Sequence, residues 1–129
     1  MPGIDLAALL RRRLALSEQV AATKFRTGQP VEDPVREQRE LARVRVLAAG
    51  IGLDPDRAAD FLAEQITASK QVQHRLFARW TDHPDELPTA GPDLSVLRAE
   101  LDALTSALLE RLALRQRPVP EVSGDGPAG

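Results

Sequence analysis

Two Asp-Pro pairs divide this chain, at residues 33–34 and 54–55, and each precedes a run of apolar residues with helical spacing. Aspartate is a favoured N-cap because its side chain accepts hydrogen bonds from the first free N–H groups of a helix. Proline fits the first helical position, where its missing N–H is not needed. The two pairs therefore predict that separate helices begin at Pro34 and Pro55.

Apolar residues recur every three or four positions in four segments, which is the period of an amphipathic helix. We expect helices over about residues 4–26, 34–50, 55–80 and 94 to at least 112. Asp5 should lie in the first turn of the first helix, Gly28 and Pro30 should end it, and Asp93 should cap the last. Aromatic residues make up only 3% and no strand-like alternation persists. The predicted fold class is all-α, a four-helix bundle.

The length of 129 residues suits one domain that can bury a core around a ligand. We expect this helical domain to span residues 1–117, and the tail PVPEVSGDGPAG at 118–129 to be disordered. The formal net charge of -2 offers no overall attraction for nucleic acid or an anionic membrane. No apolar run reaches the length of about 18 residues that a membrane span needs. Neither nucleic acid nor a membrane is expected as a partner.

The cysteine and histidine content narrows the chemistry. There is no Cys, which excludes disulfides and thiolate zinc sites, and the two His residues are isolated. Neither His74 nor His83 has a nucleophile pattern beside it. We therefore expect no metal and no cofactor. At the N-terminus the basic residues follow a short apolar run, the reverse of a secretory signal, so we expect a cytoplasmic location.

Two cations of the first predicted helix lie on the face that turns toward the bundle. Arg13 and Lys24 are eleven residues apart, which leaves them about 20° out of register at 100° per residue. Ser17 and Val20 fall between them on the same face. Long side chains at the edge of an apolar stripe often reach water, and that interpretation stays open beside an interior site.

The third predicted helix carries polar residues inside an apolar stripe. Ile66, Ser69, Gln73, Phe77 and Trp80 follow each other at helical spacing, with a hydroxyl and an amide in the middle. Buried polar groups need hydrogen-bond partners. The hydroxyl and the amide therefore either satisfy a neighbouring helix or face a cavity that holds a polar ligand.

The second and fourth predicted helices add further charged residues near their N-termini. Arg36, Glu37 and Glu40 lie in and just after the first turn, where acids favour the helix dipole. Arg36 is placed to pair with Asp33 or Glu40 on the surface. Arg98 follows the predicted cap of the fourth helix, where solvation is the default interpretation.

In order and spacing, these residues resemble the all-helical class of chorismate mutases over roughly residues 6–80. The resemblance rests on Arg13 and Lys24 eleven apart, Asp33, Arg36 and Glu37 in QPVEDPVRE, a second Asp-Pro helix start, and Ser69 and Gln73 four apart. The segment GPDLSVLR is similar to the secreted subclass, in which an arginine on a further helix completes the pocket from the same chain. Arg98 matches that arginine.

The resemblance implies a small-molecule substrate, chorismate, which rearranges to prephenate in an intramolecular [3,3] step without a cofactor. It assigns Arg13, Arg36 and Arg98 to the two substrate carboxylates, with assistance from the hydroxyl of Ser69. Aromatic amino acid biosynthesis through the shikimate pathway and a dedicated antibiotic pathway would use the same site.

The resemblance also assigns the remaining polar residues. Lys24 and Gln73 would flank the ether oxygen of the substrate, where negative charge gathers as the C–O bond breaks. Glu37 and the backbone at Asp33 would meet the C4 hydroxyl. Glu40 stands where members of the family vary and is counted with the substrate-binding residues.

Three alternatives stay open on the same scaffold. One is a mutase for 4-amino-4-deoxychorismate, whose C4 ammonium could pair with Glu37 and Glu40. The second is an isochorismate-pyruvate lyase, and the third is a non-catalytic helical binding module. The secreted subclass usually has a longer C-terminal region with cysteines and a signal peptide, none of which we expect here. Pairing of two copies into a homodimer also stays open, because the apolar helix faces suit either a bundle or a dimer interface.

Overall fold

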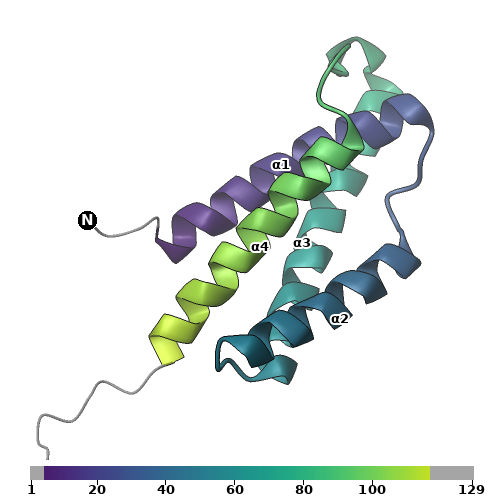
Figure 1. Cartoon of the computed structure of the whole chain (residues 1–129). Coiled ribbons are helices and arrows are strands. Elements are labelled where there is room, and N and C mark those ends of the chain that lie inside the picture. The colour runs from purple at the N-terminus through teal and green to yellow at the C-terminus, as the bar shows by residue number, and fades with distance from the viewer. Residues whose placement is uncertain (1–4, 117–129) are drawn as a thin grey trace, which may run out of the picture.

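The computed structural model describes residues 5–116, which form an all-helical domain (Figure 1). In chain order its elements are α1 (Leu6–Thr27), α2 (Pro34–Gly50), α3 (Pro55–Asp82), the short 3-10 helix η1 (Pro84–Glu86) and α4 (Leu94–Gln116). The predicted fold class is therefore confirmed. The tail expected at 118–129 lies outside the described residues.

Both Asp-Pro helix starts are confirmed. The side chain of Asp33 accepts a hydrogen bond from the backbone N–H of Arg36 at 3.2 Å. The side chain of Asp54 accepts one from the backbone N–H of Asp56 at 2.9 Å. In each case proline occupies the beginning of the helix. The local chemistry of these pairs thus determines where α2 and α3 begin.

The ends of α1 differ slightly from the expectation. Asp5 does not lie in the first turn but precedes the helix as its N-cap, with its backbone extended, and its side chain accepts from the N–H of Ala8 at 2.7 Å. At the other end Gly28 adopts a left-handed conformation with φ of 74°, which glycine accepts without steric cost. Gly28 ends α1 as predicted.

The connection between α3 and α4 holds a feature that helical periodicity does not show. Helix α3 continues to Asp82, and η1 follows at once. Two hydrogen bonds from Arg79 to the carboxylate of Glu86, at 2.7 and 2.8 Å, hold η1 against the end of α3. No helix was predicted between residues 80 and 94, so this turn was missed, although its backbone hydrogen bonds from Glu86 to His83 and from Leu87 to Pro84 are local.

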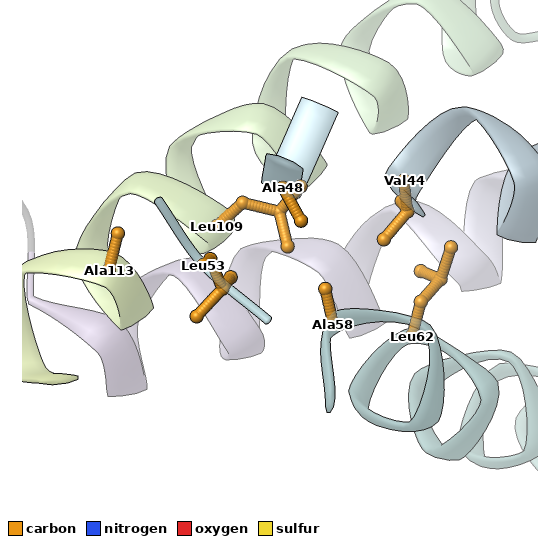
Figure 2. Close-up of a cluster of buried hydrophobic side chains, with 7 residues drawn as sticks. All are labelled: Val44, Ala48, Leu53, Ala58, Leu62, Leu109 and Ala113. Carbon is orange, nitrogen blue, oxygen red and sulfur yellow. The ribbon is translucent and has the colours of Figure 1, made fainter. Parts of the chain in front are cut away.

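The helices pack so that α1 contacts both α3 and α4, while α2 lies on α3 and also touches α4 (Figure 1). The main core cluster joins α2, α3 and α4 (Figure 2). It consists of Val44, Ala48, Leu53, Ala58, Leu62, Leu109 and Ala113. A second cluster joins Leu16 and Val20 of α1 to Leu97 of α4. Each fully buried leucine contributes roughly 1.5–3 kcal/mol to the stability of this packing.

A third cluster closes the far end of α1 against α3. Ala21 and Ala22 pack on Trp80, and Phe25 meets the rings of Phe77 and Trp80 edge-on. Between these apolar clusters the middle of the bundle is lined by charged groups.

Among residues 5–116, no helix has the length and hydrophobicity that crossing a membrane requires.

Candidate functional site

One cavity lies among the four long helices and the connection between α1 and α2. All nine site residues predicted from the sequence line it: Arg13, Lys24, Asp33, Arg36, Glu37, Glu40, Ser69, Gln73 and Arg98. The remaining lining residues are Val20, Val31, Ile66, Lys70 and Leu101. The structure therefore brings the whole predicted set together, and the roles expected of its members stay predictions.

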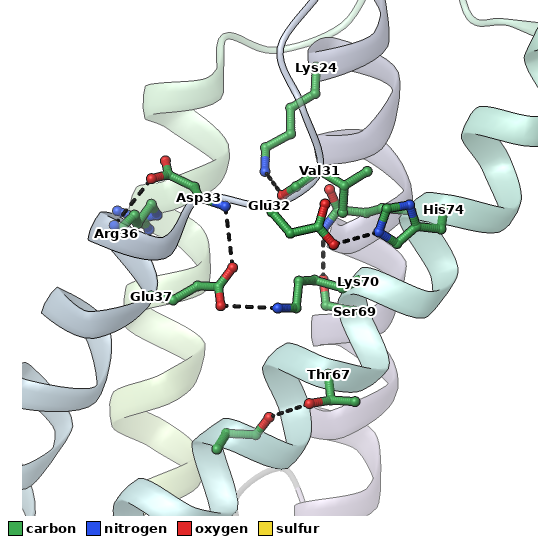
Figure 3. A network of polar contacts seen from close by, with 12 residues as sticks. Lys24, Val31, Glu32, Asp33, Arg36, Glu37, Thr67, Ser69, Lys70 and His74 are labelled. Carbon is green, nitrogen blue, oxygen red and sulfur yellow. Dashed lines mark hydrogen bonds and ion pairs between the residues drawn. The ribbon is translucent and has the colours of Figure 1, made fainter.

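The two cations of α1 are buried. Only 6% of Arg13 and 7% of Lys24 is exposed, so neither side chain reaches out along the surface as the alternative interpretation had it. The ammonium of Lys24 donates to the carbonyl of Val31 at 2.9 Å and so ties the α1–α2 connection to α1 (Figure 3). Arg13 Nε is buried without a hydrogen-bond partner among the described residues.

Burial disfavours the charged forms of these side chains, and a bound anion would offset that cost. Loss of hydration lowers the pKa of Arg13, and the positive charge of Arg36 adds to this effect. Burial likewise lowers the pKa of Lys24, with a further contribution from Arg98, and that of Arg98, with a further contribution from Arg36. Groups whose charged form is disfavoured in this way gain from a bound anion.

The N-terminus of α2 contributes acids as well as an arginine. The backbone N–H of Asp33 donates to Glu37 Oε2 at 3.3 Å, and Asp33 Oδ2 lies 3.5 Å from Arg98 Nη2. Arg36 does pair with Glu40, at 3.7 Å, as the surface alternative predicted, yet its side chain is only 28% exposed and lines the cavity. Arg98 is likewise partly buried rather than solvated.

The polar pair on α3 belongs to a short hydrogen-bonded chain. Gln73 Nε2 donates to Ser69 Oγ at 3.0 Å, and the hydroxyls of Ser69 and Ser17 are 2.7 Å apart. Gln73 is buried, and its Oε1 has no hydrogen-bond partner among the residues described. Both sequence interpretations therefore apply, because the pair contacts a neighbouring helix and also lines the cavity.

Two charged residues near the predicted set were missed. Lys70 lines the cavity, and its Nζ lies 3.1 Å from Glu37 Oε1 (Figure 3). It follows Ser69 directly and so lies about 100° away from the predicted stripe. Asp102 lies behind the cavity, 3.8 Å from Arg36 Nη2. The only signal for it was its position one turn after Arg98 on α4.

The charges of the lining favour an anion. Five lining side chains are cationic and three are acidic, a formal surplus of two positive charges, and apolar groups from Val20, Val31, Ile66 and Leu101 complete the wall. Arginines fix the orientation of a carboxylate through paired N–H donors, whereas lysine and glutamine donate to single oxygens. The cavity thus has the composition of a site for a small organic dianion with further polar groups.

A sequence model of one protein family, described as chorismate mutase type II, matches residues 4–74. The chain belongs to this family. Curated relatives include the secreted chorismate mutases of Mycolicibacterium smegmatis, 39% identical over 119 residues and 92% of this chain, and of Mycobacterium tuberculosis, 32% identical over 109 residues and 84% of this chain. The matched parts make up 64% and 53% of those two relatives, so the chain spans only part of their length.

Solved structures of chorismate mutases agree with this membership. The enzyme from Burkholderia phymatum superposes with a TM-score of 0.79 at 33% identity, covering 84% of this chain and 66% of that one. The enzyme from Burkholderia thailandensis superposes with a TM-score of 0.74 at 40% identity, covering 88% of this chain and 74% of that one.

The comparisons correct the expected location. The relatives from the two mycobacteria and from Yersinia pestis are each named secreted chorismate mutase. The expectation of a cytoplasmic location is therefore wrong. It rested on the order of charged and apolar residues in the first residues of the sequence, and the names of three relatives outweigh that order.

In this member of the chorismate mutase family, Glu40 lies close to a second acid, Asp102. Burial raises the pKa of Glu40, and the neighbouring carboxylate of Asp102 raises it further, against the attraction of Arg36 and Arg43. Asp102 Oδ1 lies 3.8 Å from Arg36 Nη2 and 3.6 Å from Arg43 Nη1. The two acids and two arginines form a network at one wall of the cavity, with Arg36 and Glu40 in the lining and Arg43 and Asp102 behind it.

We expect Glu40→Gln to raise the melting temperature at neutral pH. Because the folded-state pKa of Glu40 lies above its ordinary value of 4.5, the ionised form destabilises the folded chain. The gain should be present above the raised pKa and should disappear as the pH falls below the ordinary value, where the acid is protonated in both states. Thermal unfolding at about pH 7.5 and about pH 4 measures the difference.

The matched control is Glu64→Gln, which removes the same charge from an exposed position on α3. It should leave the melting temperature nearly unchanged at both pH values. Equal shifts for Glu40→Gln at the two pH values would show that its carboxyl group is not held at a raised pKa.

Proposed function

We propose that this chain converts chorismate to prephenate by an intramolecular [3,3] rearrangement inside the described cavity. One observation carries the proposal. Arginines from α1, α2 and α4 line the same partly apolar cavity as the ammonium of Lys24 and the side-chain amide of Gln73. The names of the relatives and of the solved neighbours support the same reaction.

In this proposal the arginines bind the substrate as a folded conformer. Arg13, Arg36 and Arg98 take the two carboxylates, and the Ser69 hydroxyl assists. Free in water, the two carboxylates favour an extended molecule, whereas the reaction needs the enolpyruvyl arm to lie over the ring. Holding both anions in fixed positions converts binding energy into the reactive geometry. The partners of Arg36 matter too, because Glu40 and Asp102 hold its guanidinium at the cavity wall.

The rearrangement breaks the C–O bond of the ether while a C–C bond forms, so no proton, nucleophile or cofactor enters the step. Negative charge gathers on the ether oxygen as the bond breaks. Lys24 uses one N–H on Val31 and keeps two more for the substrate, and Gln73 uses one amide N–H on Ser69 and keeps the other. Donors already in place stabilise this charge more in the transition state than in the ground state.

The acidic end of the cavity suits the remaining polar group of chorismate. Its C4 hydroxyl is the one group of the substrate that can donate a hydrogen bond to a carboxylate. Glu37 lines the cavity beside the backbone of Asp33 and is proposed as the acceptor. All these residues come from one chain, which supports a site that a single copy completes.

A direct assay tests the proposal. Purified protein should consume chorismate and form prephenate far faster than the uncatalysed reaction, without releasing pyruvate. Pyruvate release would identify the lyase instead. Loss of chorismate no faster than in buffer would reject the proposal and favour a non-catalytic bundle.

The names of the curated relatives further support a site of action outside the cytoplasm.

A further inference from the structure

Among the described residues that line the cavity, Lys70 is the one cation with no role in the proposed chemistry. It lies on α3 directly after Ser69, and its side chain is 29% exposed. Its ammonium lies 3.1 Å from Glu37 Oε1, within hydrogen-bond distance (Figure 3). The other oxygen of the same carboxylate accepts from the backbone N–H of Asp33 at 3.3 Å. Both oxygens of Glu37 are therefore engaged before any substrate arrives.

The neighbouring acids of this corner are paired as well. Asp33 Oδ2 lies 3.5 Å from Arg98 Nη2. The exposed Glu32, next to Asp33 in the chain, lies 2.6 Å from the ring of His74 (Figure 3). No carboxylate at this end of the cavity is without a cationic or hydrogen-bonded partner among residues 5–116. The corner can still accept a hydrogen bond, since each carboxylate oxygen has two lone pairs, but it has little net negative charge.

We propose that Lys70 determines specificity by neutralising Glu37, so that this corner accepts a hydroxyl group and rejects an ammonium group. The inference rests on the proposed function and goes beyond it, because it selects between chorismate and 4-amino-4-deoxychorismate. The two substrates differ only at C4, where one carries a neutral hydroxyl and the other a positive charge at neutral pH.

The selection follows from electrostatics. An unpaired carboxylate in a partly buried site would attract an ammonium more strongly than a hydroxyl. With Lys70 beside Glu37, an incoming ammonium meets a like charge a few ångströms away and must compete for the same oxygen atoms. A hydroxyl meets no such repulsion and needs only one lone pair. Specificity of this kind comes from a repulsive element set against the wrong substrate.

Steady-state assays of both substrates test the inference. Lys70→Met should raise the ratio of kcat/KM for the 4-amino substrate to kcat/KM for chorismate by about tenfold, as expected for removal of one partly screened like charge. Lys70→Gln should raise the ratio in the same direction and serves if the methionine variant folds poorly. Lys70→Arg keeps the charge and should keep the ratio of the unmodified chain.

The matched control is Arg75→Met, which removes the same charge from an exposed position of α3 outside the cavity. It should leave the ratio unchanged. A ratio that moves less than about twofold in both neutral Lys70 variants, or that moves equally in Lys70→Arg, would overturn the inference. An unmodified chain that does not convert chorismate would instead reject the proposed function, so the two failures are distinguishable.

Discussion

Lys24→Ala should lower kcat for chorismate by about 100- to 1000-fold, the usual effect of removing one preorganised donor to a developing negative charge. The ammonium is held in place before substrate binds, because its side chain is buried and one N–H already donates to Val31 at 2.9 Å. Alanine removes the proposed donor to the ether oxygen and leaves only Gln73 to stabilise it. Discontinuous or continuous assays of chorismate loss over a range of substrate concentrations give kcat and KM separately.

Two controls separate chemistry from folding in that experiment. Ser69→Ala should lose less activity, since the hydroxyl assists a carboxylate contact that arginines dominate and supports Gln73 through a single hydrogen bond at 3.0 Å. Thermal unfolding of Lys24→Ala should show a cooperative transition, because the apolar clusters that hold the four helices together do not include Lys24. A folded Lys24→Ala protein that keeps more than about a tenth of kcat would contradict the proposed role.

Arg13→Met should stabilise the fold while lowering kcat/KM for chorismate by about 30- to 5000-fold. The side chain is 6% exposed, its Nε has no hydrogen-bond partner among the described residues, and burial lowers its pKa. Replacing such a charge with an apolar side chain of similar length should add on the order of 1 kcal/mol or more to stability. Losing the contact to a buried substrate carboxylate should cost about 2–5 kcal/mol of transition-state binding.

The opposite directions of these two effects make the test sharp. Thermal unfolding and kcat/KM for chorismate are measured on the same preparation. Arg12→Met is the matched control, because Arg12 is the exposed neighbour, pairs with Glu100 at 3.1 Å and has a side chain that is 59% exposed. It should change stability by no more than about 1 kcal/mol and leave activity intact. A destabilised Arg13→Met protein would show that the empty site holds this cation favourably.

Much of the fold was predictable because helices depend on local interactions. The Asp33–Pro34 and Asp54–Pro55 pairs predicted two helix starts that the structure confirms. The spacing of Arg13 and Lys24 predicted one shared, inward face, and both residues are buried. Helical geometry alone relates residues on one helix, so neither prediction needed knowledge of the neighbouring helices.

The contacts between helices were not predictable in this way. Lys70 and Glu37 are 33 residues apart in the chain, and Asp102 meets Arg36 and Arg43 from another helix. Each side chain taken alone looked like an ordinary charge near a helix surface. The pairing of Arg79 with Glu86 in the turn at Pro84–Glu86 was missed as well. Such pairs form only after packing brings separate segments within a few ångströms.

The helical class and the helix starts came from the sequence alone, because hydrogen bonds within a helix and the 3.6-residue period are local. The membership of the polar set that lines the cavity came from the resemblance of its order and spacing to the chorismate mutases. The tertiary structure decided which charges neutralise each other around that cavity, and hence the character of the corner beside Glu37. The strength of an ion pair depends on distance and burial, and both are set by how the helices cross rather than by their order along the chain.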